Sequence, residues 1–329
     1  MTGQQSVLRN DGFVLVVVLW LLGSLAALVA IYSLYLTNTA TAFATHLEKV
    51  QAEGLVSAGL ELVAYQLTVG KENKKPAEET QPAQDNKAAE DTKPAQNARP
   101  AKGGFSFRAG KADISVQFSP ENARIDLNAA PKELLAGLFR SLGARREAEY
   151  LAERIVAWRT PRNAEAAAKE DETTIYRSAG LPYGAREAPF AHVYELALVA
   201  GLPPELARRA APLVTVHSGS SSFNAVEAPP ELLAAIPGVT PEQLPLLLAA
   251  RQRDPKSFQS ALAALDSGNR FVTSEAGKST RVAVGVTFSS GYRTHTEATI
   301  IVIDGDAEPY RVLSYRNDES SSPAQTRTQ

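Results

Sequence analysis

The apolar positions of this chain follow three patterns that succeed one another along the sequence. An unbroken apolar run without charged residues comes first, at residues 13–36 (FVLVVVLWLLGSLAALVAIYSLYL). A helix of that length would reach about 36 Å at 1.5 Å per residue, and the hydrocarbon core of a bilayer is about 30 Å thick. The run therefore predicts a membrane-spanning helix near the N-terminus, and no later segment is comparable.

Helical spacing continues beyond this run as far as Gly70. Between residues 37 and 70, polar residues separate the apolar ones at close to the period of a helix. These apolar positions are Leu47, Val50, Leu55, Leu60, Leu62, Val63 and Leu67. Glycine often ends a helix, so we predict one helix over residues 13–70, with a membrane half and an amphipathic half.

Residues 71–102 break the helical pattern. They contain no aromatic residue and no aliphatic residue larger than alanine, and EETQPAQDN is echoed by EDTKPAQN. Such a segment buries too little apolar area to offset the entropy of ordering it. We therefore predict a disordered linker at residues 71–102, and a disordered tail at residues 317–329.

Alternating apolar and polar residues, which are typical of half-buried strands, occur in two separate blocks. The first, residues 103–122, alternates around Phe105, Phe107, Ile114, Val116 and Phe118. The second, residues 271–316, indicates three strands with turns at SSGYR and DGDAEP. Residues 123–270 have mainly helical spacing. The predicted fold is therefore α+β, with the N-terminal helix packed on an antiparallel sheet and a large all-α domain inserted between strands.

The composition of the chain indicates few chemical functions. The 329 residues can form two domains beyond the anchor, and the net charge of -2 gives no reason to expect nucleic acid as a partner. The chain has no cysteine, which excludes disulfides and thiolate metal sites. Its four histidines, His46, His192, His217 and His295, are scattered, and no motif for a nucleophile or a phosphate loop is present. We predict no enzymatic activity.

The helical region contains an internal repeat. Residues 125–136 (IDLNAAPKELLA) recur as residues 223–234 (FNAVEAPPELLA). In each copy proline suits the first helical turn, a glutamate follows near the positive end of the helix, and a leucine pair starts the buried face. Residues 190–212 and 258–266 have the pattern of matching second halves. The repeat predicts helical packing units without a ligand.

The start of the chain resembles the leader of type IV pilins and type II secretion pseudopilins. Gly12 ends a polar leader, and Phe13 begins the apolar helix. The resemblance implies that a membrane enzyme, the prepilin peptidase, cuts between these two residues and methylates the new N-terminal Phe13. An uncleaved signal anchor is the alternative. The absence of basic residues just after Leu36 favours a cytoplasmic N-terminus.

The fifth residue after the expected cut is Val17, where most pilins have glutamate. A buried carboxylate can pair with the N-terminal amine of the adjoining subunit, whereas an unpaired charge in lipid is costly. A chain without it resembles the K-type minor pseudopilin of type II secretion (general secretion pathway protein K, GspK). The inference is that a subunit at the filament tip has no amine above it to neutralise. The simpler alternative is that Val17 only faces lipid.

An ordered set of motifs also resembles this family, from about residue 9 to residue 315. The set comprises Asn128, Trp158, Pro189-Phe190 to Glu195-Leu196, Pro212 to Val216, and Asn224. The resemblance implies a pilin-like fold and a subunit that caps the tip of the periplasmic pseudopilus and helps initiate its assembly. Expected partners are other minor pseudopilins, the prepilin peptidase, the bacterial inner membrane and secreted substrates, but not nucleic acid. The body would lie in the periplasm.

A membrane-anchored DNA receptor of a competence-type uptake system is the competing hypothesis. The N-x-A-P repeat followed by Ile236-Pro237-Gly238 also resembles helix-hairpin-helix modules, whose hairpin amides hold a phosphate. Here the usual second glycine is Thr240, the next amide is removed by Pro241, and Glu242 would repel phosphate. Residues 221–266 carry three basic and five acidic residues. The packing unit is therefore the favoured interpretation.

Calcium is the one cofactor that the sequence raises. The K-type family binds calcium through acidic residues after the tryptophan, and here only Glu170, Asp171 and Glu172 ahead of Tyr176 match that stretch. Calcium needs six to eight oxygen ligands, several of them carboxylates. A solvated acidic loop is the alternative interpretation of these three residues.

Overall fold

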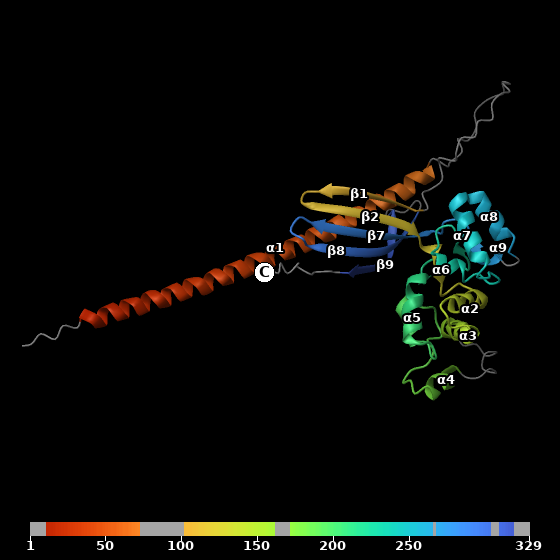
Figure 1. Ribbon diagram of the computed structural model, residues 1–329, viewed down its shortest axis with the longest axis horizontal. Helices are drawn as coiled ribbons and strands as arrows, with labels where there is room; N and C mark the ends of the chain where they lie inside the picture. Colours follow the sequence, from red (N-terminus) through yellow and green to blue (C-terminus); the bar gives the residue numbers. More distant parts are fainter. Residues whose placement is uncertain (1–10, 73–101, 162–171, 266–267, 304–308, 319–329) are drawn as a thin grey trace, which may run out of the picture.

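The chain forms one long helix that carries a compact head along part of its length (Figure 1). The computed structural model describes residues 11–72, 102–161, 172–265, 268–303 and 309–318. Helix α1 spans Asp11–Glu72 and is 62 residues long. The predicted single helix is confirmed, although Gly70 does not end it, because the helix continues to Glu72. The linker predicted at residues 71–102 and the tail at 317–329 lie almost entirely outside the described residues.

Five antiparallel strands form the sheet of the head. In sequence these are β1 (Gly103–Ala109), β2 (Ala112–Pro120), β7 (Ser279–Phe288), β8 (Arg293–Val302) and β9 (Tyr310–Asp318). They lie in the order β1-β2-β7-β8-β9, so the strands before and after the helical region meet at β2 and β7. The alternating pattern predicted these strands, and it corresponds to one buried face on strands such as β2 and β7. The predicted α+β class is confirmed.

Helix α1 packs across one face of this sheet. Its buried residues recur every three or four positions, and they include Val56, Leu60, Val63 and Leu67. They meet a layer of strand residues that includes Ile114, Val116, Val284 and Ile300. Gly59 permits this close approach, since an added Cβ would stand 3.2 Å from a methyl group of Val116. The amphipathic half of α1 therefore anchors the head.

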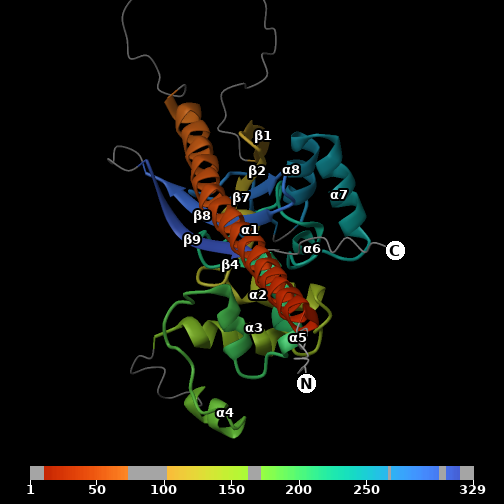
Figure 2. The ribbon, with the colours of Figure 1, turned by 90° about the vertical axis from the view of Figure 1, so that its left-hand side faces the viewer.

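The inserted region lies between β2 and β7, at the end of the sheet away from the apolar part of α1 (Figures 1 and 2). It has a hydrophobic core of its own, separate from the core between α1 and the sheet. Its first part consists of η1 (Glu121–Ala123), β3 (Ile125–Asp126), α2 (Lys132–Ser141), α3 (Ala148–Arg159), α4 (Glu172–Ser178), η3 (Val193–Leu198), α5 (Pro204–Ala210), η4 (Ala211–Leu213) and β4 (Val214–Thr215). Its second part consists of β5 (Phe223–Asn224), α6 (Pro230–Leu233), α7 (Gln243–Arg253), α8 (Pro255–Ala263), α9 (Gly268–Phe271) and β6 (Val272–Thr273).

The insert is mostly helical, but it is not purely so. Strands β3 and β4 pair in parallel, and strands β5 and β6 do the same. Each pair closes one part of the insert by joining its beginning to its end. The sequence did not predict them, because a strand of two residues is too short to show alternation. The insert therefore consists of two helical units, each tied at its base by a small parallel ladder.

Candidate functional site: the assembly helix and the repeated turns

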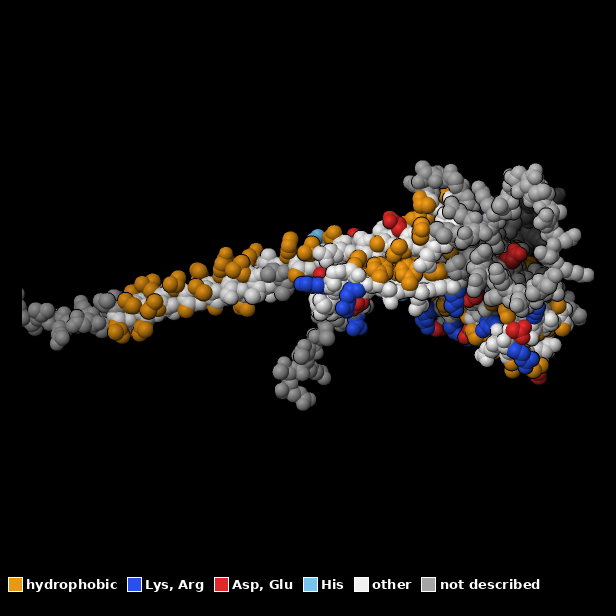
Figure 3. Space-filling model, turned by 90° about the horizontal axis from the view of Figure 1, so that it is seen from above, with side chains coloured by type: hydrophobic (Ala, Val, Ile, Leu, Met, Phe, Trp, Pro, Cys, Tyr) orange, Lys and Arg blue, Asp and Glu red, His pale blue; other side chains and the backbone are white. Residues whose placement is uncertain are grey.

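The N-terminal part of α1 is not covered by any described part of the protein. Its most apolar 18-residue window has a mean hydropathy of 2.6, and none of that window is buried. Apolar side chains such as Leu15, Trp20 and Leu28 are exposed on the helix. Figure 3 shows hydrophobic side chains along this part of α1. By length and composition this is the one candidate span among the described residues, as expected for a single-pass anchor.

The processing and assembly positions lie at the start of this span. Gly12 and Phe13 fall in the first turn of α1, and residues 1–10 of the leader lie outside the described residues. Val17 follows one turn later and is 40% exposed. From Phe13 to Leu36 the helix contains no Asp, Glu, Lys, Arg or His. The geometry thus places an apolar surface at Val17, while cleavage after Gly12 stays a prediction.

A second exposed apolar surface lies on α1 beside the head. Phe43, Leu47, Val50 and Tyr65 are all exposed on the helix face that points away from the sheet, and we call these four residues the outer stripe. At 100° per residue they lie opposite the buried positions such as Val56 and Leu60. The helical spacing of the sequence does not by itself separate Leu47 and Val50 from the core positions. Their angular positions around the helix, on the side opposite the buried residues, separate the two faces.

The repeated segments at residues 125–136 and 223–234 build the same turn twice, although only the first copy reads N-x-A-P, and an arginine holds each turn closed. In the first unit Arg159 donates hydrogen bonds to the carbonyls of Leu127 (2.5 Å) and Ala130 (2.7 Å). In the second unit Arg251 donates to the carbonyls of Ala225 (3.4 Å) and Ala228 (2.6 Å). Burial lowers the pKa of Arg159. Sequence analysis missed both arginines, because each clamps a turn that lies far away in the sequence.

The acceptor residues at the start of each turn fix the backbone in a similar way. Oδ1 of Asp126 accepts from the amide of Asn128 (2.7 Å), and Oδ1 of Asn224 accepts from the amide of Val226 (3.0 Å). The second oxygen of Asp126 also accepts from the amide and hydroxyl of Ser218 and from the amide of Gly219. The serine-rich loop at residues 218–222 is therefore held in a fixed turn by Asp126.

The residues that carried the family resemblance meet in the first unit. The rings of Trp158 and Phe190 stack at 6.0 Å, and the ring of Tyr176 lies 5.9 Å from that of Trp158. Asn128 both donates to and accepts from the backbone of Phe190, at 3.0 and 2.7 Å. Burial raises the pKa of Tyr176 to about 12. The cluster is buried, so these residues support the fold of the insert and present no reactive group.

The Ile236-Pro237-Gly238 turn satisfies several of its own backbone groups. The amide of Val239 donates to the carbonyl of Ile236 (3.1 Å), and the amide of Thr240 donates to Oε1 of Gln243 (2.9 Å). A hydrogen bond from Thr240 lowers the pKa of Glu242, which keeps a negative charge beside the turn. This arrangement does not favour the phosphate binding on which the DNA-receptor hypothesis depends.

The three candidate calcium ligands are only partly within the described residues. Glu170 and Asp171 lie outside them. The carboxylate of Glu172, at the start of α4, forms an ion pair with Arg154 at 2.6 Å, and both side chains are largely buried. No group of three acidic or histidine residues suited to a metal occurs in the part of the chain that the structure describes. Calcium binding stays a prediction.

Comparison with known proteins agrees with the motifs. Residues 117–219, which run from β2 through the first unit, match the family model described as type II secretion system protein K. The fold is similar to that of a chain in the crystal structure of the GspK-GspI-GspJ complex from the type 2 secretion system of enterotoxigenic Escherichia coli. That match has a TM-score of 0.59 and 19% sequence identity, and it covers 84% of this chain and 99% of the other. The comparison with curated proteins gives no match. The family model matches less than half of the chain and the solved structure shows a similar fold, and both agree with the sequence motifs in supporting a K-type minor pseudopilin of type II secretion.

Proposed function

We propose that this chain caps the tip of the periplasmic pseudopilus and helps to initiate its assembly. The observation that carries the proposal is the apolar surface at Val17, in a span without any acidic side chain. A subunit inside a pilin shaft would use a carboxylate at this position to pair with the amine of its neighbour. A subunit that lacks the carboxylate cannot make this pair, which suits the last position in the stack.

The shape of the head supports the same position. The two helical units project sideways from the end of the sheet that is remote from the apolar part of α1 (Figures 1 and 2). A subunit stacked beyond them would need to accommodate a head about as large as the pilin-type part itself. The insert would therefore act as a steric end to the filament.

The outer stripe is the surface that we propose for the other minor pseudopilins. Phe43, Leu47, Val50 and Tyr65 form an exposed row on the face of α1 opposite the head, where neighbouring helices can pack. The complex of similar fold contains GspI and GspJ beside GspK, so partners of those two types are the proposed neighbours. Secreted substrates would touch the exposed head.

The proposed topology follows from the same helix. The N-terminus would lie in the cytoplasm, α1 would cross the inner membrane once, and the prepilin peptidase would cut between Gly12 and Phe13. N-terminal sequencing of the membrane protein tests this directly. A mature chain that begins with N-methylated Phe13 supports the proposal, whereas an intact Met1 contradicts it.

The cap position is tested by placing a carboxylate in the span. Val17→Glu restores the shaft-type pairing group, and Val18→Glu places the same charge one residue away as the matched control. Gold labelling of assembled pseudopili should find the wild-type chain at one end only. The Val17→Glu chain should also appear along the shaft, and the Val18→Glu chain should not. Labelling of the wild-type chain throughout the shaft would contradict the cap.

The calcium prediction needs a separate titration. Calorimetry on the calcium-free chain should show saturable heat if Glu170, Asp171 and Glu172 contribute ligands. The triple change to Gln, Asn and Gln should abolish that heat. Because Glu172 already pairs with Arg154, calcium would have to compete with this ion pair or use the other oxygen of the carboxylate. A titration without heat of binding would contradict the prediction that this chain binds calcium.

A further inference from the structure

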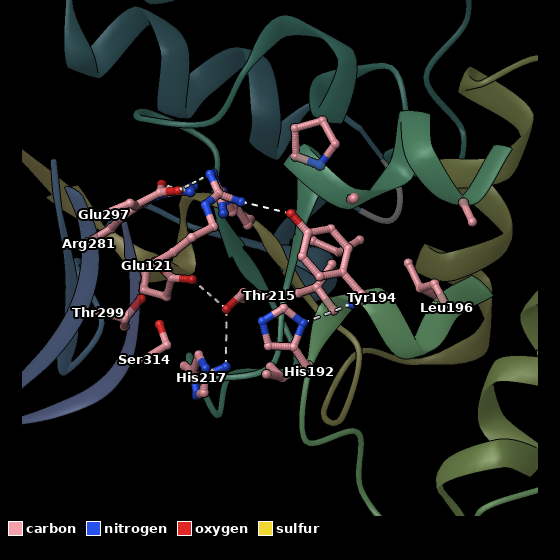
Figure 4. A pocket seen from close by; sticks show the side chains of 18 of the residues that line it. Glu121, His192, Tyr194, Leu196, Thr215, His217, Arg281, Glu297, Thr299 and Ser314 are labelled. Atoms are coloured by element: carbon pink, nitrogen blue, oxygen red, sulfur yellow. Dashed lines mark hydrogen bonds and ion pairs between the residues drawn. The ribbon is translucent and has the colours of Figure 1, made fainter. Parts of the chain in front are cut away.

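A cavity of about 460 Å³ lies where the first helical unit meets the outer face of the sheet. One wall comes from β7, β8 and β9, and the other from η3, α5 and β4 (Figure 4). Its size falls within the range of small-molecule sites, and such sites are common at junctions between domains. The cavity is remote from the outer stripe and from the span, so the proposed assembly role does not use it.

Glu121 lines this cavity, and one oxygen of its carboxylate is buried without a hydrogen-bond partner among the described residues. The residue is 3% exposed, and Oε1 accepts a hydrogen bond from the hydroxyl of Thr215 at 2.5 Å. Oε2 has no hydrogen-bond partner among the described residues. Burial raises the pKa of Glu121, which reflects the cost of keeping this group without water. A buried acceptor of this kind calls for a donor from outside the chain.

Arginine side chains bring positive charge to the same cavity. Arg281 and Arg316 both pair with Glu297 on the sheet wall, so two cations share one carboxylate. Arg124 also lines the cavity. Burial lowers the pKa of Arg124, Glu121 partly offsets this, and the nearby Arg316 lowers the pKa further. An anion between these cations would relieve both the repulsion and the desolvation.

The two requirements together define the ligand. The arginines would repel a cationic donor to Glu121, so they favour a neutral donor group on a molecule that is itself negative. We propose that the cavity binds a small hydroxycarboxylate, whose carboxylate meets Arg124 and whose hydroxyl donates to Oε2 of Glu121. This proposed ligand site does not depend on the membrane span or on the position of the chain in the filament.

Isothermal titration of the full chain in detergent tests the site with malate and succinate, which differ only by a hydroxyl group. Malate should bind saturably, and succinate should bind about tenfold more weakly, because one hydrogen bond to a buried acceptor is lost. Arg124→Gln should weaken both acids at least tenfold. Arg124→Lys keeps the charge but loses the planar guanidinium, so its affinity for both acids should lie between those of the wild-type chain and Arg124→Gln.

Two further variants make the result specific. Glu121→Gln keeps an oxygen for Thr215 but offers no second acceptor, so the preference for malate over succinate should disappear. Arg146→Gln removes an exposed arginine outside the cavity, and it should bind both acids like the wild-type chain. Thermal unfolding of each variant checks that it is folded. The proposal is overturned if malate gives no saturable heat, if the wild-type chain does not distinguish the acids, or if folded Arg124→Gln binds unchanged.

Discussion

The two helical units of the insert use one backbone device but fill their cores differently. The amide of Leu127 donates to the carbonyl of Thr215 (2.8 Å), and the amide of Ala225 donates to the carbonyl of Thr273 (3.0 Å). In both units an arginine then clamps the turn. The residue before the clamp is Trp158 in the first unit and Ala250 in the second. The turn and its clamp are therefore the shared part, and the core around them is free to vary.

This difference shows which interactions define a unit. The first unit surrounds its clamp with an aromatic cluster and accepts four hydrogen bonds at Asp126. The second has Asn224, whose amide donates to the carbonyl of Glu275 at 3.3 Å, beside the buried rings of Phe223 and Phe258. The first unit should consequently depend more on its polar contacts than the second does.

The largest effect is expected where the two units touch. Gly137 in α2 packs against the backbone carbonyl of Ala235, and an added Cβ would overlap that oxygen. Backbone cannot move aside as a flexible side chain can, so Gly137→Ala should destabilise the chain by about 4 kcal/mol. Ala235 occupies the equivalent repeat position, and Ala235→Gly should cost only about 1 kcal/mol. Urea unfolding followed by circular dichroism measures both, and equal losses would contradict this asymmetry.

Removal of the clamps should have the next largest effect. Arg159→Met keeps the length of the side chain but leaves two turn carbonyls without their donor, at an expected cost of about 3 kcal/mol. Arg251 makes one short and one long hydrogen bond, so Arg251→Met should cost about 2 kcal/mol. The same unfolding measurement compares them. A larger loss at Arg251 would show that the second unit is the more dependent one.

Exchange of the acceptors tests the polar difference directly. Asp126→Asn places an amide group against the donors of Ser218 and Gly219, and the expected loss is about 2 kcal/mol. The reciprocal Asn224→Asp brings a carboxylate toward the carbonyl of Glu275, at an expected cost of about 1 kcal/mol. If both exchanges were neutral, the two residues would be interchangeable and the hydrogen-bond patterns would not specify the units.

The sequence predicted the elements whose pattern of apolar and polar residues repeats over many positions. It predicted α1, the strands of the sheet and the repeated turns, because each repeats its pattern over many residues. It did not separate the outer stripe from the core face, since both consist of apolar residues at helical spacing. The angular position of Phe43 and Val50, not their type, distinguishes the two faces.

Contacts between residues far apart in the sequence could not be predicted, for a different reason. The clamp by Arg159 and the bridge from Asn128 to Phe190 join segments that no local period relates. The cavity beside Glu121 likewise exists only because β7 to β9 and the first unit meet in three dimensions. The motif order did identify Asn128, Trp158 and Phe190 as a set, but only the structure shows that they pack together.

The smallest effect concerns Glu121, whose buried carboxylate contacts Thr215 at the end of the first unit. Thr215 and Thr273 are equivalent ladder residues, yet only the hydroxyl of Thr215 donates to a buried acid among the described residues, namely Glu121. Burial raises the pKa of Glu121 above its ordinary value of 4.5, so the folded state favours the protonated form. This contribution to stability is fully present below pH 4.5, and it is lost as the pH rises through the raised pKa. Glu121→Gln should match the wild-type chain at pH 4 and be more stable at pH 7, by less than the loss at Asp126→Asn. Unfolding midpoints at the two pH values give this difference, and a Gln variant that is less stable at pH 7 would mean that the charged form is favoured.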